Sequence, residues 1–127
     1  MQHICNFSDF AVGTDIETIS RFEKYANSRE LALKLGVFSS AELDYCFSSA
    51  KCAQHLAARF CAKEAIYKAF SVLGVENIPN FKEIEILNLP SGAPFVNFLN
   101  KDFEKFTCRL SLSHSKDNAV AFVVICL

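Results

Sequence analysis

Several features that would place a small protein in a common class are missing from this sequence. None of the six cysteines forms a CxxC pair, the spacing typical of zinc and redox sites, and only three histidines could join them as ligands. We therefore expect reduced, mostly packed thiols in a cytoplasmic protein. No run approaches the roughly 18 apolar residues of a membrane span. Polar residues also come too early at the N-terminus for a signal peptide.

The sequence also lacks an excess of basic charge. Its formal net charge is −1, which gives no support for broad nucleic-acid binding. A local cluster of cations must therefore hold any anionic ligand. Tryptophan is absent, but 13 phenylalanines and 51% hydrophobic residues provide much apolar surface to bury. Some of that surface is expected at a subunit interface.

Repeats, low-complexity tracts and long linkers are absent as well, so we expect a single domain over residues 1–127. Helical patterns dominate the first half of the chain, and apolar or alternating segments typical of strands dominate the second. The fold class predicted is α+β, with an antiparallel sheet formed late in the chain. The expected strands are Phe10–Gly13, Glu83–Leu89, Phe95–Leu99, Phe106–Ser113 and Ala119–Leu127.

Three helical regions are predicted from their start and stop signals. Thr14 and Glu17 have capping-box spacing, which predicts a helix start there and a helical region ending near Gly36. Ser39 and Glu42 repeat that spacing, before a shorter helix through about Phe47. The longest helix is expected from near Lys51 to Leu73, with Gly74 as its stop.

The long helix combines apolar faces with charge. One stripe holds Cys52, Leu56, Phe60, Tyr67 and Phe70, and the opposite side is also apolar, so the helix is expected to be buried. It nevertheless carries four charged residues within three turns: Arg59, Lys63, Glu64 and Lys68. Unpaired charge is costly to bury, so these groups need partners.

Structural and functional explanations of these charges are both open. Structurally, Glu64 and Lys68 have the spacing of an i,i+4 ion pair, and Lys63 can extend its head to solvent with its stem on Phe60 and Tyr67. Functionally, three cations can hold an anion such as a phosphate while one carboxylate binds a metal.

Two residues elsewhere have the same double interpretation. Asp15 is explained by a helix start, but it is also placed to share a Mg²⁺ ion with Glu64, because Mg²⁺ typically takes one or two carboxylates together with substrate phosphates. His114 follows a predicted strand, where it is either an ordinary turn residue or a donor to a phosphate or nucleotide.

Taken together, the segments resemble the holo-acyl-carrier-protein synthase family of 4′-phosphopantetheinyl transferases. The blocks that carry the resemblance follow the family's order over nearly the whole chain from about Val12: GTDIETISR (13–21), SSAELDY (39–45), LAARFCAKEAIYKAF (56–70), SGAP (91–94) and SLSHSKDNAVAFVV (111–124). The KEAxxKA block after Asp15 and Ile16 is the specific part.

The resemblance implies a fold, a reaction and a set of roles. The fold is that of the 4′-phosphopantetheinyl transferases, with a long helix packed on an antiparallel sheet and an active site at each interface of a homotrimer. In the family reaction, a serine hydroxyl of an apo acyl carrier protein attacks the β-phosphorus of coenzyme A, which transfers phosphopantetheine and releases adenosine 3′,5′-bisphosphate. Mg²⁺ is the metal cofactor, coenzyme A is the donor substrate, and fatty acid biosynthesis is the expected context.

The resemblance also implies roles for individual residues. Asp15 and Glu64 would bind Mg²⁺ and, with Lys68, form the catalytic set, in which Glu64 is a candidate general base. The residues implied around coenzyme A are Arg59, Lys63, Lys68, Gly92, Pro94 and His114. The residues implied in docking of the carrier protein are Arg21, Lys24, Tyr25 and Arg29.

Three departures from the family pattern leave two alternative functions open. Residues 71–74 replace a glycine-rich turn, Ala93 replaces a common basic residue, and about ten extra residues precede the first strand. The first rival is a non-catalytic relative that keeps the trimer and binds coenzyme A or the carrier without transfer. The second is a small nucleotide- or partner-binding α+β module that matches by chance.

Overall fold

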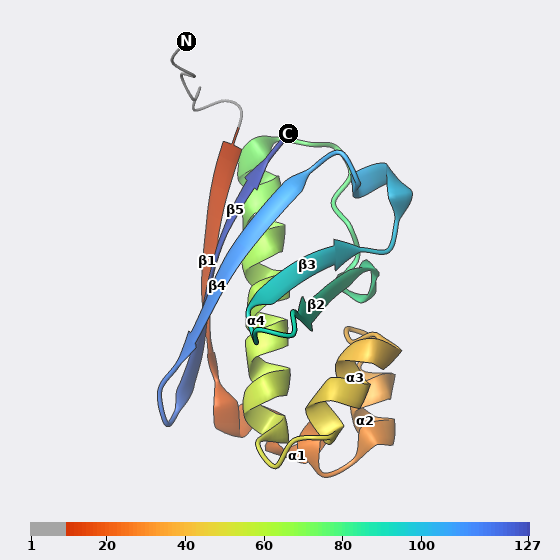
Figure 1. The fold of residues 1–127 in the computed structure, drawn as a ribbon, viewed down its shortest axis with the longest axis vertical. Helices are drawn as coiled ribbons and strands as arrows, with labels where there is room; N and C mark the ends of the chain where they lie inside the picture. The colour runs from red at the N-terminus through yellow and green to blue at the C-terminus, as the bar shows by residue number, and fades with distance from the viewer. Residues whose placement is uncertain (1–9) are drawn as a thin grey trace.

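A long helix packed on an antiparallel sheet forms the centre of the protein. The structure, a computed structural model, describes residues 10–127. Helix α4 (Cys52–Leu73) lies against a sheet of β1 (Phe10–Thr18), β5 (Asn118–Cys126) and β4 (Thr107–His114), in that order (Figure 1). The expected α+β class and this packing are confirmed. Because β1 pairs with β5, the sheet joins the two ends of the described chain and is not formed late.

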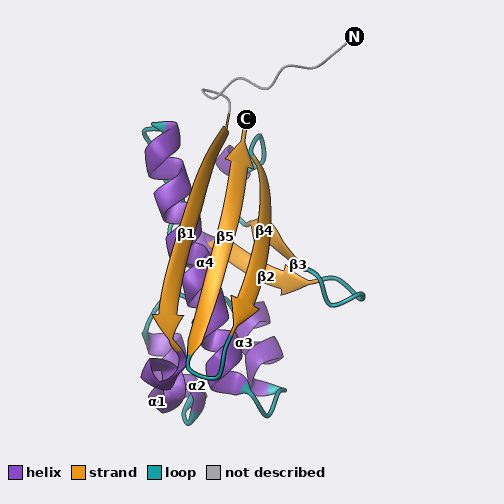
Figure 2. Cartoon of the chain, turned by 90° about the vertical axis from the view of Figure 1, so that its left-hand side faces the viewer, coloured by secondary structure: helices purple, strands orange, loops and turns teal. Residues whose placement is uncertain are grey.

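The alternation of side chains along the strands gives the sheet two different faces. Ala119, Ala121, Val123 and Ile125 of β5 point toward α4 and are fully buried. On the opposite face, which faces the viewer in Figure 2, no element of residues 10–127 is packed. That outer face exposes 62% of Ile16 and 47% of both Val12 and Phe122.

Strand β1 approaches α4 closely at Gly13. A Cβ atom at this position would collide with the backbone carbonyl oxygen of Ala65. Only glycine allows the two backbones to come this close, and the backbone nitrogen of Ala69 lies at the same contact. The close approach places Asp15, two residues along the strand, beside the middle of the helix.

The local stop and start signals predicted most helix bounds correctly. Gly74 ends α4 with a φ of 80°, and α3 (Ser40–Phe47) begins with the capping box of Ser39 and Glu42. A second antiparallel pair, β2 (Ile84–Asn88) and β3 (Pro94–Phe98), packs beside α4. Short 3₁₀ turns occur at Phe81–Glu83 (η3) and Lys101–Phe103 (η4).

The predicted first helix is wrong at its start. Residues 14–17 belong to β1, and helical turns begin only with η2 (Ile19–Phe22), followed by α1 (Glu23–Ala26) and α2 (Arg29–Lys34). The Thr14 hydroxyl donates to the carbonyl of Ala121 at 3.0 Å instead of capping a helix. Pairing with β5 therefore overrides the local capping signal. The expected stop at Gly36, with a φ of 76°, is present.

Two further predictions concern the cysteines and the membrane. Cys46, Cys52, Cys61, Cys108 and Cys126 are free thiols, whereas Cys5 and the rest of the N-terminal extension lie outside the described residues. Within residues 10–127, every helix is too short or too polar to cross a bilayer.

Candidate active site

Asp15, Glu64 and Lys68 come together where β1 crosses α4. The Lys68 ammonium donates to Asp15 Oδ1 at 3.0 Å. The second oxygen of that carboxylate, Oδ2, is buried and has no hydrogen-bond partner in the part of the chain that the structure describes. Glu64 makes no hydrogen bond or ion pair with any described residue, so the i,i+4 pair of Glu64 with Lys68 does not form. A buried, unpartnered oxygen of Asp15 and the partly exposed carboxylate of Glu64 therefore lie in one place.

A third carboxylate, Glu17, adds to the negative charge of this cluster. Burial raises the pKa of Glu17, and the neighbouring Asp15 carboxylate raises it further, through the hydrogen bond that a protonated Glu17 would donate to it and through its charge. Glu64 also contributes to that increase, which shows that the three acids affect one another. Such mutual repulsion favours binding of a cation.

The acid cluster fits a hard divalent cation. An unpartnered, buried carboxylate oxygen is costly unless a ligand satisfies it, and Asp15 Oδ2 is such an atom. No group of three or more His, Cys, Asp or Glu residues in the described chain is arranged to hold a metal. These residues therefore do not form a metal site with three or more such protein ligands. Mg²⁺, however, usually binds one or two carboxylates and completes its coordination shell with water and phosphate oxygens. Asp15 and Glu64 meet this requirement.

The second group of predicted residues lines a cavity of about 250 Å³. Arg59, Gly92, Pro94 and His114 all contribute to its wall. Arg59 is only 2% exposed, and its Nη2 donates to Asn88 Oδ1 at 2.6 Å. Its Nε is buried without a partner. A nearly buried arginine whose side chain lines a cavity is suited to bind an anion.

His55 also lines this cavity and contributes to its electrostatics. Burial lowers the pKa of His55, and the nearby positive charges of Arg59, His114 and Lys51 lower it further. The imidazole packs edge-on against Tyr45, with ring centroids 5.2 Å apart. An anion bound here would reduce the repulsion among these groups.

Lys63 does not lie with the other cations. Its side chain is fully buried, and Nζ donates to Glu42 Oε1 at 2.6 Å and to the carbonyls of Val37 at 2.6 Å and Phe81 at 2.8 Å. Burial lowers the pKa of Lys63, and Glu42 opposes that shift. All three protons of the ammonium are used, so none is free for a phosphate of coenzyme A. The alternative in which Lys63 extends to solvent is also wrong.

The two groups of site residues lie on opposite sides of α4. Arg59 and Lys68 are nine residues apart, which at about 100° per residue separates them by about 180° around the helix. Asp15 is on β1 at one edge of the sheet, whereas His114 is on β4 at the other (Figure 2). One chain therefore does not bring the acid cluster and the anion cavity together.

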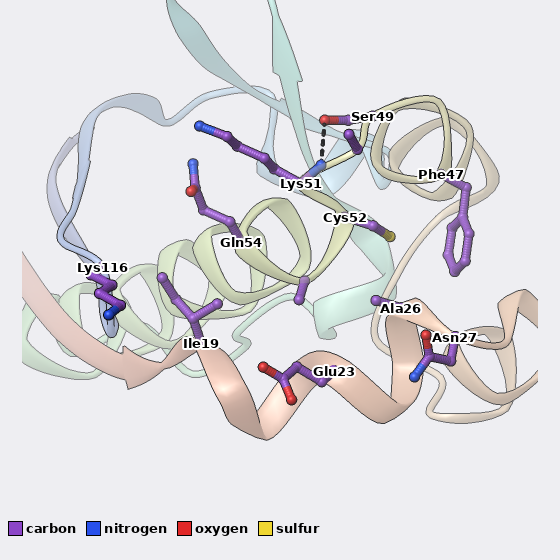
Figure 3. Close-up of a pocket in the computed structure, with 12 residues that line it drawn as sticks. Ile19, Glu23, Ala26, Asn27, Phe47, Ser49, Lys51, Cys52, Gln54 and Lys116 are labelled. Atoms are coloured by element: carbon purple, nitrogen blue, oxygen red, sulfur yellow. Dashed lines mark hydrogen bonds between the residues drawn. The ribbon is translucent and has the colours of Figure 1, made fainter.

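A separate cavity of about 710 Å³ contains none of the predicted catalytic residues. Its wall is formed by the η2–α1 region, by the turn between α3 and α4, and by Lys116 (Figure 3). In that turn, the Lys51 backbone amide donates to Ser49 Oγ at 3.1 Å. Gln54 lines both this cavity and the smaller one, so the two adjoin at the start of α4.

The predicted docking residues lie on three short helical elements instead of one helix. Arg21 pairs with Glu17 at 2.7 Å and lies over the Phe60 ring, while Arg29 pairs with Asp44 at 2.6 Å. Lys24 extends over the Tyr25 ring. Exposed cations next to aromatic rings thus form a mixed basic and apolar surface.

Sequence reasoning missed four residues around these sites. Asn88, Tyr45 and His55 line the anion cavity, and Glu42 is the partner of Lys63. Glu42 was identified only as part of a capping box, and its complete burial had no signal in the sequence. Gly13 did have a signal, because glycine inside a strand often marks a close backbone approach.

Comparison with known proteins shows the class to which this fold and site belong. The model of the 4′-phosphopantetheinyl transferase superfamily matches residues 11–123. The chain belongs to that superfamily, within its holo-acyl-carrier-protein synthase family, and is a transferase.

Individual relatives agree with this assignment. The chain is 37% identical over 122 residues to a holo-[acyl-carrier-protein] synthase of Geobacter sp. (strain M21), covering 91% of this chain and 97% of the relative. It is 41% identical over 115 residues to a protein of the same name from Thermodesulfovibrio yellowstonii, covering 90% and 96%.

Solved structures show the same fold. The Chronobacterium ammoniagenes ACPS–CoA complex matches with a TM-score of 0.74 and 29% identity, over 92% of this chain and 96% of that one. The Helicobacter pylori holo-[acyl-carrier-protein] synthase in complex with coenzyme A matches with a TM-score of 0.73 and 26% identity, over 90% and 98%.

Proposed function

We propose that the protein catalyses Mg²⁺-dependent transfer of 4′-phosphopantetheine from coenzyme A to a serine of an apo acyl carrier protein, in fatty acid biosynthesis. Adenosine 3′,5′-bisphosphate is the second product. The observation that carries the proposal is the unpartnered, buried Oδ2 of Asp15, beside Lys68 and Glu64 in a chain of this family. The cytoplasmic location and the single domain over residues 1–127 stay predictions from the sequence.

Asp15, Glu64 and Lys68 each have a role in this reaction. A bound Mg²⁺ neutralises charge that develops on the phosphates. Asp15 and Glu64 would hold the ion, and Glu64 is also a candidate to accept the proton of the serine hydroxyl, directly or through water. Lys68, with its half-exposed side chain, would hold a diphosphate oxygen and orient the phosphorus for in-line attack.

The anion cavity supplies the nucleotide half of the site. Arg59 and His114 would bind a phosphate of the nucleotide, and the loop with Gly92 and Pro94 would cover it. Lys63 is not included among the residues proposed to bind coenzyme A, because its ammonium forms a buried ion pair with Glu42.

A homotrimer would bring the two halves of the site together. The acid cluster and the anion cavity lie at opposite edges of the sheet, so a head-to-tail contact can place the cluster of one subunit beside the cavity of the next. The exposed apolar face with Val12, Ile16 and Phe122 offers the surface for that contact. Active sites would then lie at each interface.

The carrier protein would dock on the basic and apolar surface near the acid cluster. Arg21 is paired with Glu17, and the Asp15 carboxylate lies near enough to raise the pKa of Glu17, so this surface adjoins the proposed metal site. Lys24, Tyr25 and Arg29 extend it. Attraction of an acidic carrier helix by these cations should weaken with salt, seen as a KM for the carrier that rises with ionic strength.

The test of the proposed function is the mass of the carrier. The protein is incubated with Mg²⁺, coenzyme A and apo acyl carrier proteins, and a mass increase of one phosphopantetheine is expected. Asp15→Ala and Glu64→Ala should abolish transfer with the fold retained by circular dichroism, whereas the exposed control Glu76→Ala should remain active. No mass increase on any carrier would refute the enzyme, and active alanine variants would refute the metal assignment.

A second candidate is a relative that binds coenzyme A without transfer. The observation in its favour is that α4 continues to Leu73, so helix occupies the place of the glycine-rich turn that the family resemblance leads one to expect. Binding of coenzyme A in calorimetry without any carrier modification would support this candidate.

A further inference from the structure

Asn88, the last residue of β2, connects two parts of the anion cavity. Its Oδ1 accepts from Arg59 Nη2 at 2.6 Å, and its Nδ2 donates to the carbonyl of Gly92 at 3.0 Å. Both ends of the amide are therefore used. The reverse orientation would place the amide N–H groups against the guanidinium donors and its oxygen against a carbonyl, so only one orientation fits.

Arg59 is held in two directions by its neighbours. The guanidinium lies over the Tyr45 ring, with Cζ 4.3 Å from the ring centroid, which fixes its plane. Asn88 then fixes its rotation within that plane. Of the remaining contacts, Nη1 reaches only the His55 carbonyl, at 3.4 Å, and the buried Nε has no partner.

We propose that Asn88 is a positioning residue for nucleotide binding, which holds the Arg59 guanidinium toward the cavity and links it to the Gly92 loop. The inference rests on the proposed function, in which this cavity takes the nucleotide of coenzyme A. Without Asn88, the charge of Arg59 remains but its donors lose their fixed direction. Bidentate phosphate binding depends on that direction as much as on the charge.

The first experiment measures binding of adenosine 3′,5′-bisphosphate by isothermal titration calorimetry. Asn88→Ala is expected to raise the Kd about tenfold, the equivalent of one hydrogen bond to a charged group. The matched control is Asn97→Ala, in the same hairpin, because Asn97 donates to Glu85 at 2.9 Å and does not line the cavity. Its Kd should stay within about twofold of the wild type.

The second experiment separates positioning from a general structural role. If Asn88 acts through Arg59, then Asn88→Ala should change the Kd less than about twofold in an Arg59→Met background. Arg59→Lys serves the same purpose if Arg59→Met does not fold, as judged by its thermal melting. An equal effect of Asn88→Ala in both backgrounds, or no effect in the wild-type background, would overturn the inference.

The wild-type measurements separate this inference from the proposed function. If the wild type binds the nucleotide and modifies a carrier but Asn88→Ala binds equally well, only the positioning role of Asn88 is refuted. If the wild type neither binds adenosine 3′,5′-bisphosphate nor modifies a carrier, the proposed function is refuted and this inference with it.

Discussion

The buried ammonium of Lys63 shows how one residue can connect several elements. It joins α4 to α3 through Glu42 and to the segments that contain Val37 and Phe81. Glu42 in turn accepts from the backbone amides of Ser39 and Ile86, each at 3.0 Å. This network holds α3 and β2 against the long helix, and both elements contribute wall residues to the anion cavity.

Removal of one partner of this ion pair should strongly destabilise the fold. Lys63→Met leaves the Glu42 carboxylate buried without its countercharge, so we expect the free energy of unfolding in urea to fall by about 3–5 kcal/mol. The control is Lys68→Met, which breaks a more exposed pair and should change the free energy of unfolding far less. A Lys63→Met variant as stable as the control would contradict the structural role.

His55 should make stability depend on pH. Burial and the charges of Arg59, His114 and Lys51 lower its pKa below the ordinary value of 6.5, so the unfolded chain binds more protons than the folded one. Its contribution is therefore complete above 6.5 and is lost as the pH falls through 6.5 toward the folded value. His55→Phe, which keeps a ring against Tyr45, should reduce the loss of stability between about pH 7.5 and 5.5 in urea titrations. An unchanged pH profile would refute this role.

At the scale of elements, the contact of β1 with α4 determines where the acid cluster forms. Gly13→Ala would drive a Cβ into the Ala65 carbonyl, and no flexible side chain is available to move aside. We expect β1 to shift, the free energy of unfolding to fall by about 1–3 kcal/mol, and transfer activity to fall as Asp15 moves away from Glu64. Thermal melting and the rate of carrier modification measure the two effects. Thr18→Ala, at the exposed end of the strand, is the control, and a fully active, stable Gly13→Ala would show that the contact is dispensable.

Whether the sequence predicted an element correctly depended on whether the signals for that element are local. The bounds of α3 and α4 were predictable because their signals are local: a capping box at Ser39 and a left-handed glycine at Gly74. The Thr14–Glu17 signal failed because β1 pairs with β5, which lies about a hundred residues further along the chain. Local propensity carries no information on such a contact.

The site was predictable in part for the same reason. The structure brings Asp15, Glu64 and Lys68 together, as the paired-carboxylate argument expected. Lys63 has the same spacing on the helix as a surface cation, but its partner Glu42 comes from another element. Asn88 ends a strand without any recognisable pattern, so only the folded structure shows its link to Arg59.

At the scale of the whole molecule, the outer face of the sheet should control assembly. Phe122 is 47% exposed and lies between Thr14 and Ser111 in the strand register. Phe122→Glu should convert a trimer to monomers in light scattering and abolish transfer, because charge is costly to bury at an apolar interface. Val72→Glu is the control, since Val72 is 72% exposed near the end of α4 and is not a residue of the sheet. A monomeric wild type that remains active would refute the interfacial site.

The acid cluster and the anion cavity lie on opposite sides of α4, so two variants that are inactive alone should be active when they assemble together. An Asp15→Ala chain keeps an intact anion cavity, and an Arg59→Met chain keeps an intact acid cluster. An interface between the two kinds of chain can therefore hold one complete active site. Equal mixtures that exchange subunits would contain about one intact site in every four interfaces. Transfer should therefore return when two inactive preparations are unfolded and refolded together. If no activity returns although mixed trimers form, each site is built within a single chain.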